Sequence, residues 1–202
     1  MRQFILALLV LGVLPLHGQR FFLQLQPEAG VSSFTSGIIP YELRSSYQVS
    51  LALGLQMNDR SAVTLGLGVQ QSGARSTVIY AVGGATTRDI LYQDAYFIKV
   101  PLDYTISLGS RGLFTLGIGA YYNLNITDRV VDMEVNDGYF PLHAEDYTKD
   151  DIGLRLRPAV SIPFTPKISL SLGILQEFGL VAFVPRTHHY NTYLTGGIKV
   201  QL

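Results

Sequence analysis

Charged side chains stand among small and apolar residues in several alternating segments of the chain, and they are the first candidates for chemistry. They are Glu28, Lys99, Asp103, Arg155, Arg157, Glu177 and Lys199. An unpaired charge in a confined interior is costly, whereas opposite charges that meet there compensate each other. We therefore expect an ion-pair network of Glu28, Lys99, Asp103, Arg155, Arg157 and Glu177 that fills an interior and fixes register. A narrow ion-selective pore along the same charges is the alternative, and it requires conductance in planar bilayers.

Histidine is the second candidate, because lipid-modifying barrel enzymes use a His beside a Ser and an acid at the barrel rim. His143 lies near Glu145 and Asp146, and the pair His188-His189 precedes the last alternating segment. No Ser stands near them in a recognisable arrangement, and the GxSxG and HExxH motifs are absent. The sequence predicts solvated loop histidines, no catalytic residue, no metal site and no cofactor. A rim-located lipid-modifying enzyme is the alternative, and unchanged lipid A masses after substitution of His188 and His189 would exclude it.

The elements that must position these side chains are strands. From Tyr47 to Met57 every second residue is large and apolar, and the residues between them are small or polar. This period of two predicts a β-strand with one apolar face. Equivalent segments span 22–33, 45–57, 61–72, 94–106, 112–126, 151–164, 167–179 and 190–201. Each is long enough to cross a bilayer at a tilt, so the sequence predicts an all-β, eight-stranded antiparallel up-and-down transmembrane barrel.

The residues between the large apolar ones form the second face of each strand, and their composition indicates whether the apolar face points toward lipid or toward a soluble core. That face carries mostly Gly, Ala, Ser, Thr and Asn, whereas a soluble sandwich would solvate it with Lys and Glu. A soluble lipocalin-like barrel is the alternative fold, excluded by partition into outer membranes and heat-modifiable gel mobility. Aromatic side chains favour the two rims of an apolar band. The expected membrane-interface aromatics are Tyr47, Tyr96, Tyr122 and Tyr190 near one rim and Tyr104, Phe114 and Phe164 near the other.

Short and long connections alternate along the chain. The segments 58–60, 107–111 and 165–166 are short, and 34–44, 74–93, 127–150 and 180–189 are long. Bacterial outer-membrane barrels have short periplasmic turns and longer extracellular loops. We therefore expect periplasmic termini and extracellular long loops. The acidic 127–150 loop predicts solvation, with calcium or a basic partner as the alternative.

The N-terminus and the composition set the compartment. Arg2 precedes an apolar run from Phe4 to Leu14, which predicts a secretory signal peptide over 1–18 and a barrel domain over 19–202. Fifteen basic residues offset fifteen acidic ones without clustering, which argues against nucleic-acid binding. Cysteine is absent, so disulfides, thiolate metal sites and a Cys nucleophile are excluded. The expected location is the outer membrane of a Gram-negative cell, in contact with its lipid.

One segment carries a family resemblance. Tyr96-Phe-Ile-Lys-Val-Pro-Leu-Asp-Tyr104, with Val100-Pro101-Leu102 at its centre, resembles the strand motif of PorT-like eight-stranded outer-membrane barrels. The Gly- and Tyr-rich segment 114–123 is similar to the next strand of that family. The resemblance implies a non-enzymatic protein that assists protein secretion or binds surface partners, and it supplies no catalytic residue. Pro101 inside a strand forfeits a ladder hydrogen bond, which predicts a bulge or a weak spot.

Overall fold

A barrel of eight β-strands forms the body of the protein. The computed structural model describes residues 20–36, 41–82, 85–109, 113–126, 131–134, 150–180 and 187–202, so the expected signal peptide lies outside the described residues. The barrel strands are β1 (Arg20–Ser36), β3 (Arg44–Asn58), β4 (Ser61–Val82), β5 (Ala85–Leu108), β6 (Phe114–Asn125), β8 (Asp151–Pro163), β9 (Ile168–Gly179) and β10 (Thr187–Gln201). Two short strands, β2 (Tyr41–Glu42) and β7 (Val131–Glu134), pair with β4 and β5 respectively.

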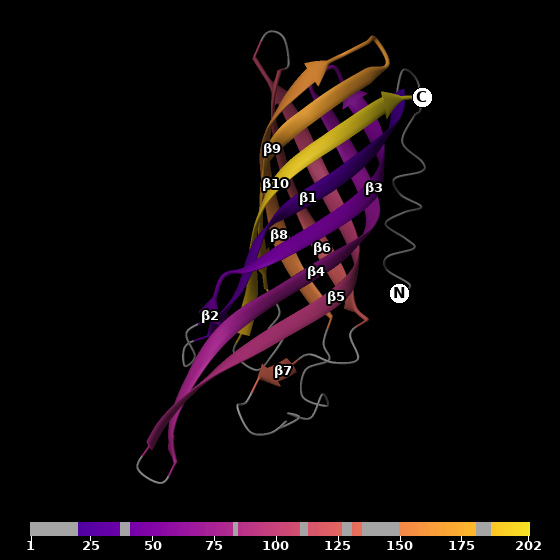
Figure 1. Ribbon diagram of the computed structural model, residues 1–202. Coiled ribbons are helices and arrows are strands. Elements are labelled where there is room, and N and C mark those ends of the chain that lie inside the picture. The colour runs from indigo at the N-terminus through magenta and orange to yellow at the C-terminus, as the bar shows by residue number, and fades with distance from the viewer. Residues whose placement is uncertain are drawn as a thin grey trace.

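The sheet closes because each barrel strand pairs antiparallel with two others. The ring runs β1, β3, β4, β5, β6, β8, β9, β10 and returns to β1, with the β4–β5 pairing completing it. Barrel strands that follow one another in the chain are therefore neighbours, and they run obliquely around the barrel axis (Figure 1). Closure leaves the body of the sheet without a free edge. The predicted eight-stranded up-and-down barrel is confirmed.

Tight turns join the strands at the end of the barrel where the C-terminus lies (Figure 1). Between β3 and β4, the Asn58 side chain accepts a hydrogen bond from the Arg60 amide at 2.9 Å. Between β8 and β9, the Thr165 hydroxyl accepts one from the Ile168 amide at 3.0 Å. After β5, Gly109 has a φ of 81°, a left-handed conformation that side chains other than glycine rarely adopt. Asx, Thr and Gly chemistry therefore makes these turns short.

Large apolar side chains cover the outside of the barrel, and polar side chains fill the inside. On β3, the odd-numbered residues from Tyr47 to Leu53 are exposed, whereas Gln48 and Ser50 are buried. Leu172 on β9 and Leu194 on β10 are each 69% exposed. A continuous apolar surface of this kind would drive association in water, but it matches the hydrocarbon of a bilayer. The distribution is that of a transmembrane barrel.

The long connections contain more strand than the sequence predicts, and the loop assigned to 74–93 is wrong. β4 continues to Val82 and β5 begins at Ala85, with paired residues from Ala74↔Gln93 to Val82↔Ala85. The prediction ended each strand near the span of a bilayer. Antiparallel strands can pair beyond it, because each supplies the partner groups for the backbone N–H and C=O of the other. The 180–189 loop is likewise shorter than predicted, since β10 begins at Thr187.

Pro101 produces a gap in a ladder without a bulge, which is the weak spot that the sequence predicts as the second possibility. The β4–β5 pairing lapses between Leu65↔Leu102 and Gly68↔Lys99 and resumes in the same register. On its other side Pro101 pairs with Tyr121 of β6. Two other prolines, Pro27 and Pro158, lie in equivalent gaps of the β1–β10 and β8–β9 ladders. Each proline lacks an N–H, so one ladder loses a short stretch while the other holds the strand in place.

Candidate functional site

The four cations and three carboxylates that the sequence singles out face the lumen of the barrel. They are Lys99, Arg155, Arg157 and Lys199, with Glu28, Asp103 and Glu177. Side chains on a strand alternate between its two faces, so these charges share a face with the small residues that line the interior. The structure brings the first three cations and all three carboxylates into one connected cluster. Lys199 lies apart from it, toward the end that carries the tight turns.

Lys99 of β5 and Glu177 of β9 form an ion pair across the lumen. The Lys99 ammonium donates to Glu177 Oε1, to Gln48 Oε1 at 2.7 Å and to Gln70 Oε1 at 3.0 Å. It also lies 4.5 Å from the centre of the Tyr121 ring. Both charged side chains are almost fully buried. Because β5 and β9 are not neighbours in the sheet, this pair ties distant walls of the barrel together.

Arg155 of β8 connects the remaining carboxylates. Its Nε lies 3.3 Å from Asp103 Oδ1 and 3.8 Å from Glu177 Oε1, and its Nη2 lies 3.7 Å from Glu28 Oε1. Arg157 shares Asp103, with Nη2 3.7 Å from Oδ2. The guanidinium of Arg155 is therefore surrounded by three carboxylates from β1, β5 and β9. Through these contacts Arg155 connects β8 with β1, β5 and β9.

Neutral polar groups complete the layer around the charges. The Tyr193 hydroxyl lies 2.8 Å from Ser46 Oγ and accepts a hydrogen bond from Gln70 at 3.1 Å. Asn191 accepts from the Ser72 hydroxyl at 3.1 Å and donates to Glu177 Oε2 at 3.3 Å. The contacts of Tyr193 and of Ser72 with Asn191 join β10 to β3 and β4, which are not its neighbours, whereas Asn191 and Glu177 lie on adjacent strands. The interior of an eight-stranded barrel is just wide enough for side chains to fill it, and at the level of this cluster they do.

His189 is buried, so its prediction as a solvated loop histidine is wrong. It lies on β10, and its Nδ1 is 3.1 Å from Asp151 Oδ2 on β8. The same carboxylate oxygen accepts a hydrogen bond from the Tyr121 hydroxyl at 3.0 Å. The imidazole packs edge-on against Phe97, with ring centres 5.4 Å apart. His188, one residue earlier, is exposed on the opposite face of the strand.

The sequence contained a signal for this His–Asp–Tyr cluster. His189 is two residues before Asn191 and four before Tyr193, which both face the lumen. Asp151 is likewise two and four residues before Gly153 and Arg155. Extending the period of two beyond the expected strand of 190–201 places His189 inside the barrel. Following it back from Arg155 to the first residue of the expected strand over 151–164 places Asp151 there as well.

The expected membrane-interface aromatics all lie on the outer face. Exposed on it are Tyr47, Tyr96, Tyr104, Phe114, Tyr122 and Phe164. Tyr190 is half-buried and packs against Phe178, with ring centres 5.2 Å apart. Tyr47 and Tyr96 flank Gln71 of β4 from its two sides, so they share one level of the barrel. The Tyr122 hydroxyl donates to Asp150, at the end of β6 away from the tight turns.

The described residues offer no gathered metal ligands. Among them, no three His, Asp or Glu side chains come together as a group that could hold a metal ion. The same residues contain no helix long and apolar enough to cross a membrane. His143, Glu145 and Asp146 lie outside the described part of the chain. Of the acidic loop over 127–150, the structure describes Val131–Glu134 and Asp150.

Known proteins with related folds are surface and outer-membrane proteins. Neisserial surface protein A is 16% identical, with 89% of this chain and 97% of that chain covered and a TM-score of 0.47. Ail, the attachment invasion locus protein of Yersinia pestis, in complex with the heparin analogue sucrose octasulfate, is 10% identical, with 89% and 98% covered and a TM-score of 0.45. The outer membrane protein OprG from Pseudomonas aeruginosa is 14% identical, with 89% and 95% covered and a TM-score of 0.45.

No protein-family model matches the chain, and no curated protein sequence matches it. The PorT-like resemblance therefore rests on the segment around Val100-Pro101-Leu102. At identities of 10–16%, none of the three solved structures transfers a function to this chain.

Proposed function

We propose that this chain is a non-enzymatic outer-membrane barrel that binds a surface or secretion partner through its long hairpins. An apolar outer face and a lumen filled by paired charges support a structural role for the barrel body. In this proposal the termini and tight turns are periplasmic, and the opposite end is extracellular. The role in binding then belongs to the segments that leave the membrane at that end.

The observation that carries the proposal is the hairpin of β4 and β5. It projects well past the other barrel strands at the end opposite the C-terminus (Figure 1). β3 pairs with β4 as far as Tyr47↔Gln71, and β6 pairs with β5 as far as Phe97↔Asn125. The β4–β5 ladder itself continues to Val82↔Ala85. From Ser72 to Val82 this is about 35 Å of strand at roughly 3.3 Å per residue.

The backbone edges of this hairpin are suited to strand addition. β2 pairs with β4 only at Arg75 and Ser76, and β7 pairs with β5 only over Ile90–Gln93. Beyond those residues, within the described part of the chain, the two strands pair only with each other. A partner that adds an extended segment gains main-chain hydrogen bonds on such an edge. The PorT-like resemblance implies two kinds of partner for this edge, a protein of a secretion system or a partner at the cell surface.

The same contacts weigh against the two alternatives. An ion-selective pore needs an open lumen, but the charges and amides that face the lumen are bonded to one another. For a lipid-modifying enzyme, His189 is not available at the outer rim, because it faces inward and is held by Asp151. His188 is exposed on the outer face, so substitution of His188 is the decisive test of this alternative.

A shortened hairpin tests the proposal in intact cells. Thr77 and Ile90 are directly paired, so residues 78–89 can be replaced by an Asn-Gly turn that closes the two strands. The change retains the pairing of β2 and β7 and the whole barrel. We expect the variant to reach the outer membrane with heat-modifiable gel mobility but to lose surface attachment or the secretion that depends on the protein.

Two results decide the test. Loss of attachment or secretion with a folded barrel supports binding through the hairpin. Unchanged attachment and secretion in cells that carry the shortened hairpin would overturn it. An epitope placed between Val82 and Ala85 checks the orientation, because antibody must reach it on unbroken cells. Labelling that needs a permeabilised outer membrane contradicts the assignment of this end as extracellular.

A further inference from the structure

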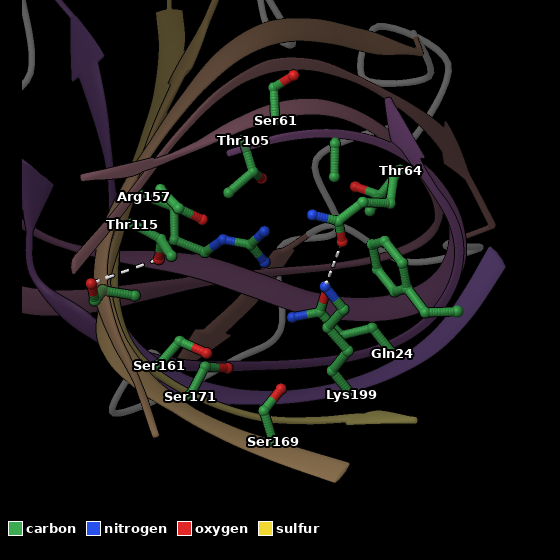
Figure 2. A pocket seen from close by; sticks show the side chains of 15 residues that line it. Gln24, Ser61, Thr64, Thr105, Thr115, Arg157, Ser161, Ser169, Ser171 and Lys199 are labelled. Atoms are coloured by element: carbon green, nitrogen blue, oxygen red, sulfur yellow. Dashed lines mark hydrogen bonds between the residues drawn. The ribbon is translucent and has the colours of Figure 1, made fainter. Parts of the chain in front are cut away.

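A polar cavity opens inside the barrel at the end that carries the tight turns. Its volume is about 80 Å³, well above the 10–15 Å³ or so that one water requires. Hydroxyl side chains from five strands line it, among them Thr64, Thr105 and Ser171. Figure 2 shows Arg157 and Lys199 reaching into this space from different parts of the wall. Among the described residues, no carboxylate lines the cavity.

The two cations at the cavity are incompletely compensated. Arg157 Nη2 lies 3.7 Å from Asp103, but that carboxylate also serves Arg155. The Nη1 atom of Arg157 is buried and has no hydrogen-bond partner within the described part of the chain. The Lys199 ammonium donates to Gln56 Oε1 at 3.2 Å and lies 3.9 Å from the centre of the Phe22 ring, neither of which carries a negative charge. Positive charge therefore predominates locally at this cavity, because the described residues that line it include two cations and no carboxylate.

We propose that the cavity binds a small tetrahedral oxyanion of the phosphate class, held between the Arg157 guanidinium and the Lys199 ammonium. The guanidinium supplies an unused donor, and hydroxyls are suitable donors for the remaining oxygens of such an anion. Lys199 is only half-buried, which gives an anion in water a route to the site. The wall of the barrel separates the cavity from lipid, so the ligand is the free ion rather than a lipid headgroup. The inference is independent of the hairpin and its partner.

Calorimetric titration of inorganic phosphate into the folded barrel tests the site. The protein is held in a nonionic, phosphate-free detergent at constant ionic strength maintained with sodium chloride. We expect saturable binding of one phosphate per barrel. Lys199→Gln should weaken it about tenfold, because one charge-assisted contact is lost. Lys167→Gln is the matched control, since Lys167 is exposed in the β8–β9 turn and outside the cavity, and it should bind as the original chain does.

Arg157→Gln provides a second variant, expected to abolish saturable binding. Lys199→Gln keeps the test decisive if Arg157→Gln fails to fold, because Lys199 takes no part in the ion-pair cluster. Heat-modifiable gel mobility establishes that each variant is folded. Absence of saturable heat with the original chain would overturn the proposal. So would equal affinity in the folded Lys199→Gln variant, or binding that appears only when phospholipid replaces inorganic phosphate.

Discussion

Glu177 is the residue on which the central charges of the barrel converge. Its carboxylate accepts from Lys99 and Asn191 and lies 3.8 Å from Arg155 Nε. The side chain has no exposed surface. A charge in such a place is tolerated only because its partners are there too, so the loss of one member leaves the others uncompensated. The energetic importance of the cluster therefore shows in single substitutions.

Glu177→Gln should destabilise the barrel by about 3–5 kcal/mol, the usual cost of breaking a buried ion pair. The amide retains the volume of the carboxylate and leaves Lys99 and Arg155 with one negative charge fewer. Urea unfolding of the detergent-refolded protein measures the free energy. Arg60→Gln, in the exposed β3–β4 turn, is the control and should change it by less than about 0.5 kcal/mol. A Glu177→Gln variant as stable as this control would show that the pairing contributes nothing.

At this scale the sequence predicts which face a charge is on, but not which charge it meets. Alternation places Lys99, Asp103 and Arg155 on the lumen face of their strands without further information. The contact between Lys99 and Glu177 depends on how β5 and β9 are staggered across the lumen, which no local pattern encodes. The His189 contact with Asp151 was missed for a second reason. His189 lies in the expected 180–189 loop, to which the period of two was not applied, and Asp151 is the first residue of the expected strand over 151–164.

At the scale of the elements, prolines interrupt three of the strand ladders, at Pro27, Pro101 and Pro158. At Pro101 the ring points into the lumen and packs beside Gly66 on β4. A Cβ added at Gly66 would lie 2.8 Å from Pro101 Cγ. At Pro27 the opposite residue is Gly196, where an added Cβ meets nothing nearer than 4.0 Å. The two glycines therefore have different structural roles although both face a proline gap.

Alanine at the two glycines should have opposite effects. Gly66→Ala forces a side chain against the rigid proline ring and should cost about 1–3 kcal/mol. Gly196→Ala has free space and a φ that any residue tolerates, so it should be neutral or stabilise by up to about 1 kcal/mol through the unfolded chain. Paired urea unfolding curves provide the comparison. Equal stability of the two variants would contradict a packing role for Gly66.

The elements also show where sequence patterns stop being informative. The eight strands are predictable because a strand that faces lipid must be apolar at every second residue. This alternation is required only over the length of strand that crosses the bilayer. Beyond it, the strands β4 and β5 run on as paired strands as far as Val82 and Ala85. Outside a bilayer, strand pairing does not require alternate apolar residues, so the segment 74–93 has the sequence of a loop by that criterion. The β-branched run Thr77-Val78-Ile79 was the local sign that it is not.

The polarity of the whole molecule is the reverse of that of a soluble protein. Paired charges lie inside the barrel, and Leu, Val and aromatic side chains lie outside. In water such a surface would be a liability, and in a bilayer it is what holds the protein in place. The reversal distinguishes a membrane barrel from a lipocalin-like barrel of the same topology. Because of this reversal, a charged side chain on the outer face lowers the free energy of unfolding by an amount that depends on its depth in the membrane.

An arginine scan of the outer face measures that depth. Leu194 lies near the middle of β10 and is 69% exposed, so Leu194→Arg should destabilise the barrel by about 2–4 kcal/mol in lipid vesicles. Phe164, 75% exposed beside the β8–β9 turn, lies at the rim, where Phe164→Arg should cost only about 0–1 kcal/mol. Unfolding in vesicles gives both values. In a water-soluble barrel an arginine at either place would be solvated, so a costless Leu194→Arg that raises solubility without detergent would mean that this face does not meet lipid.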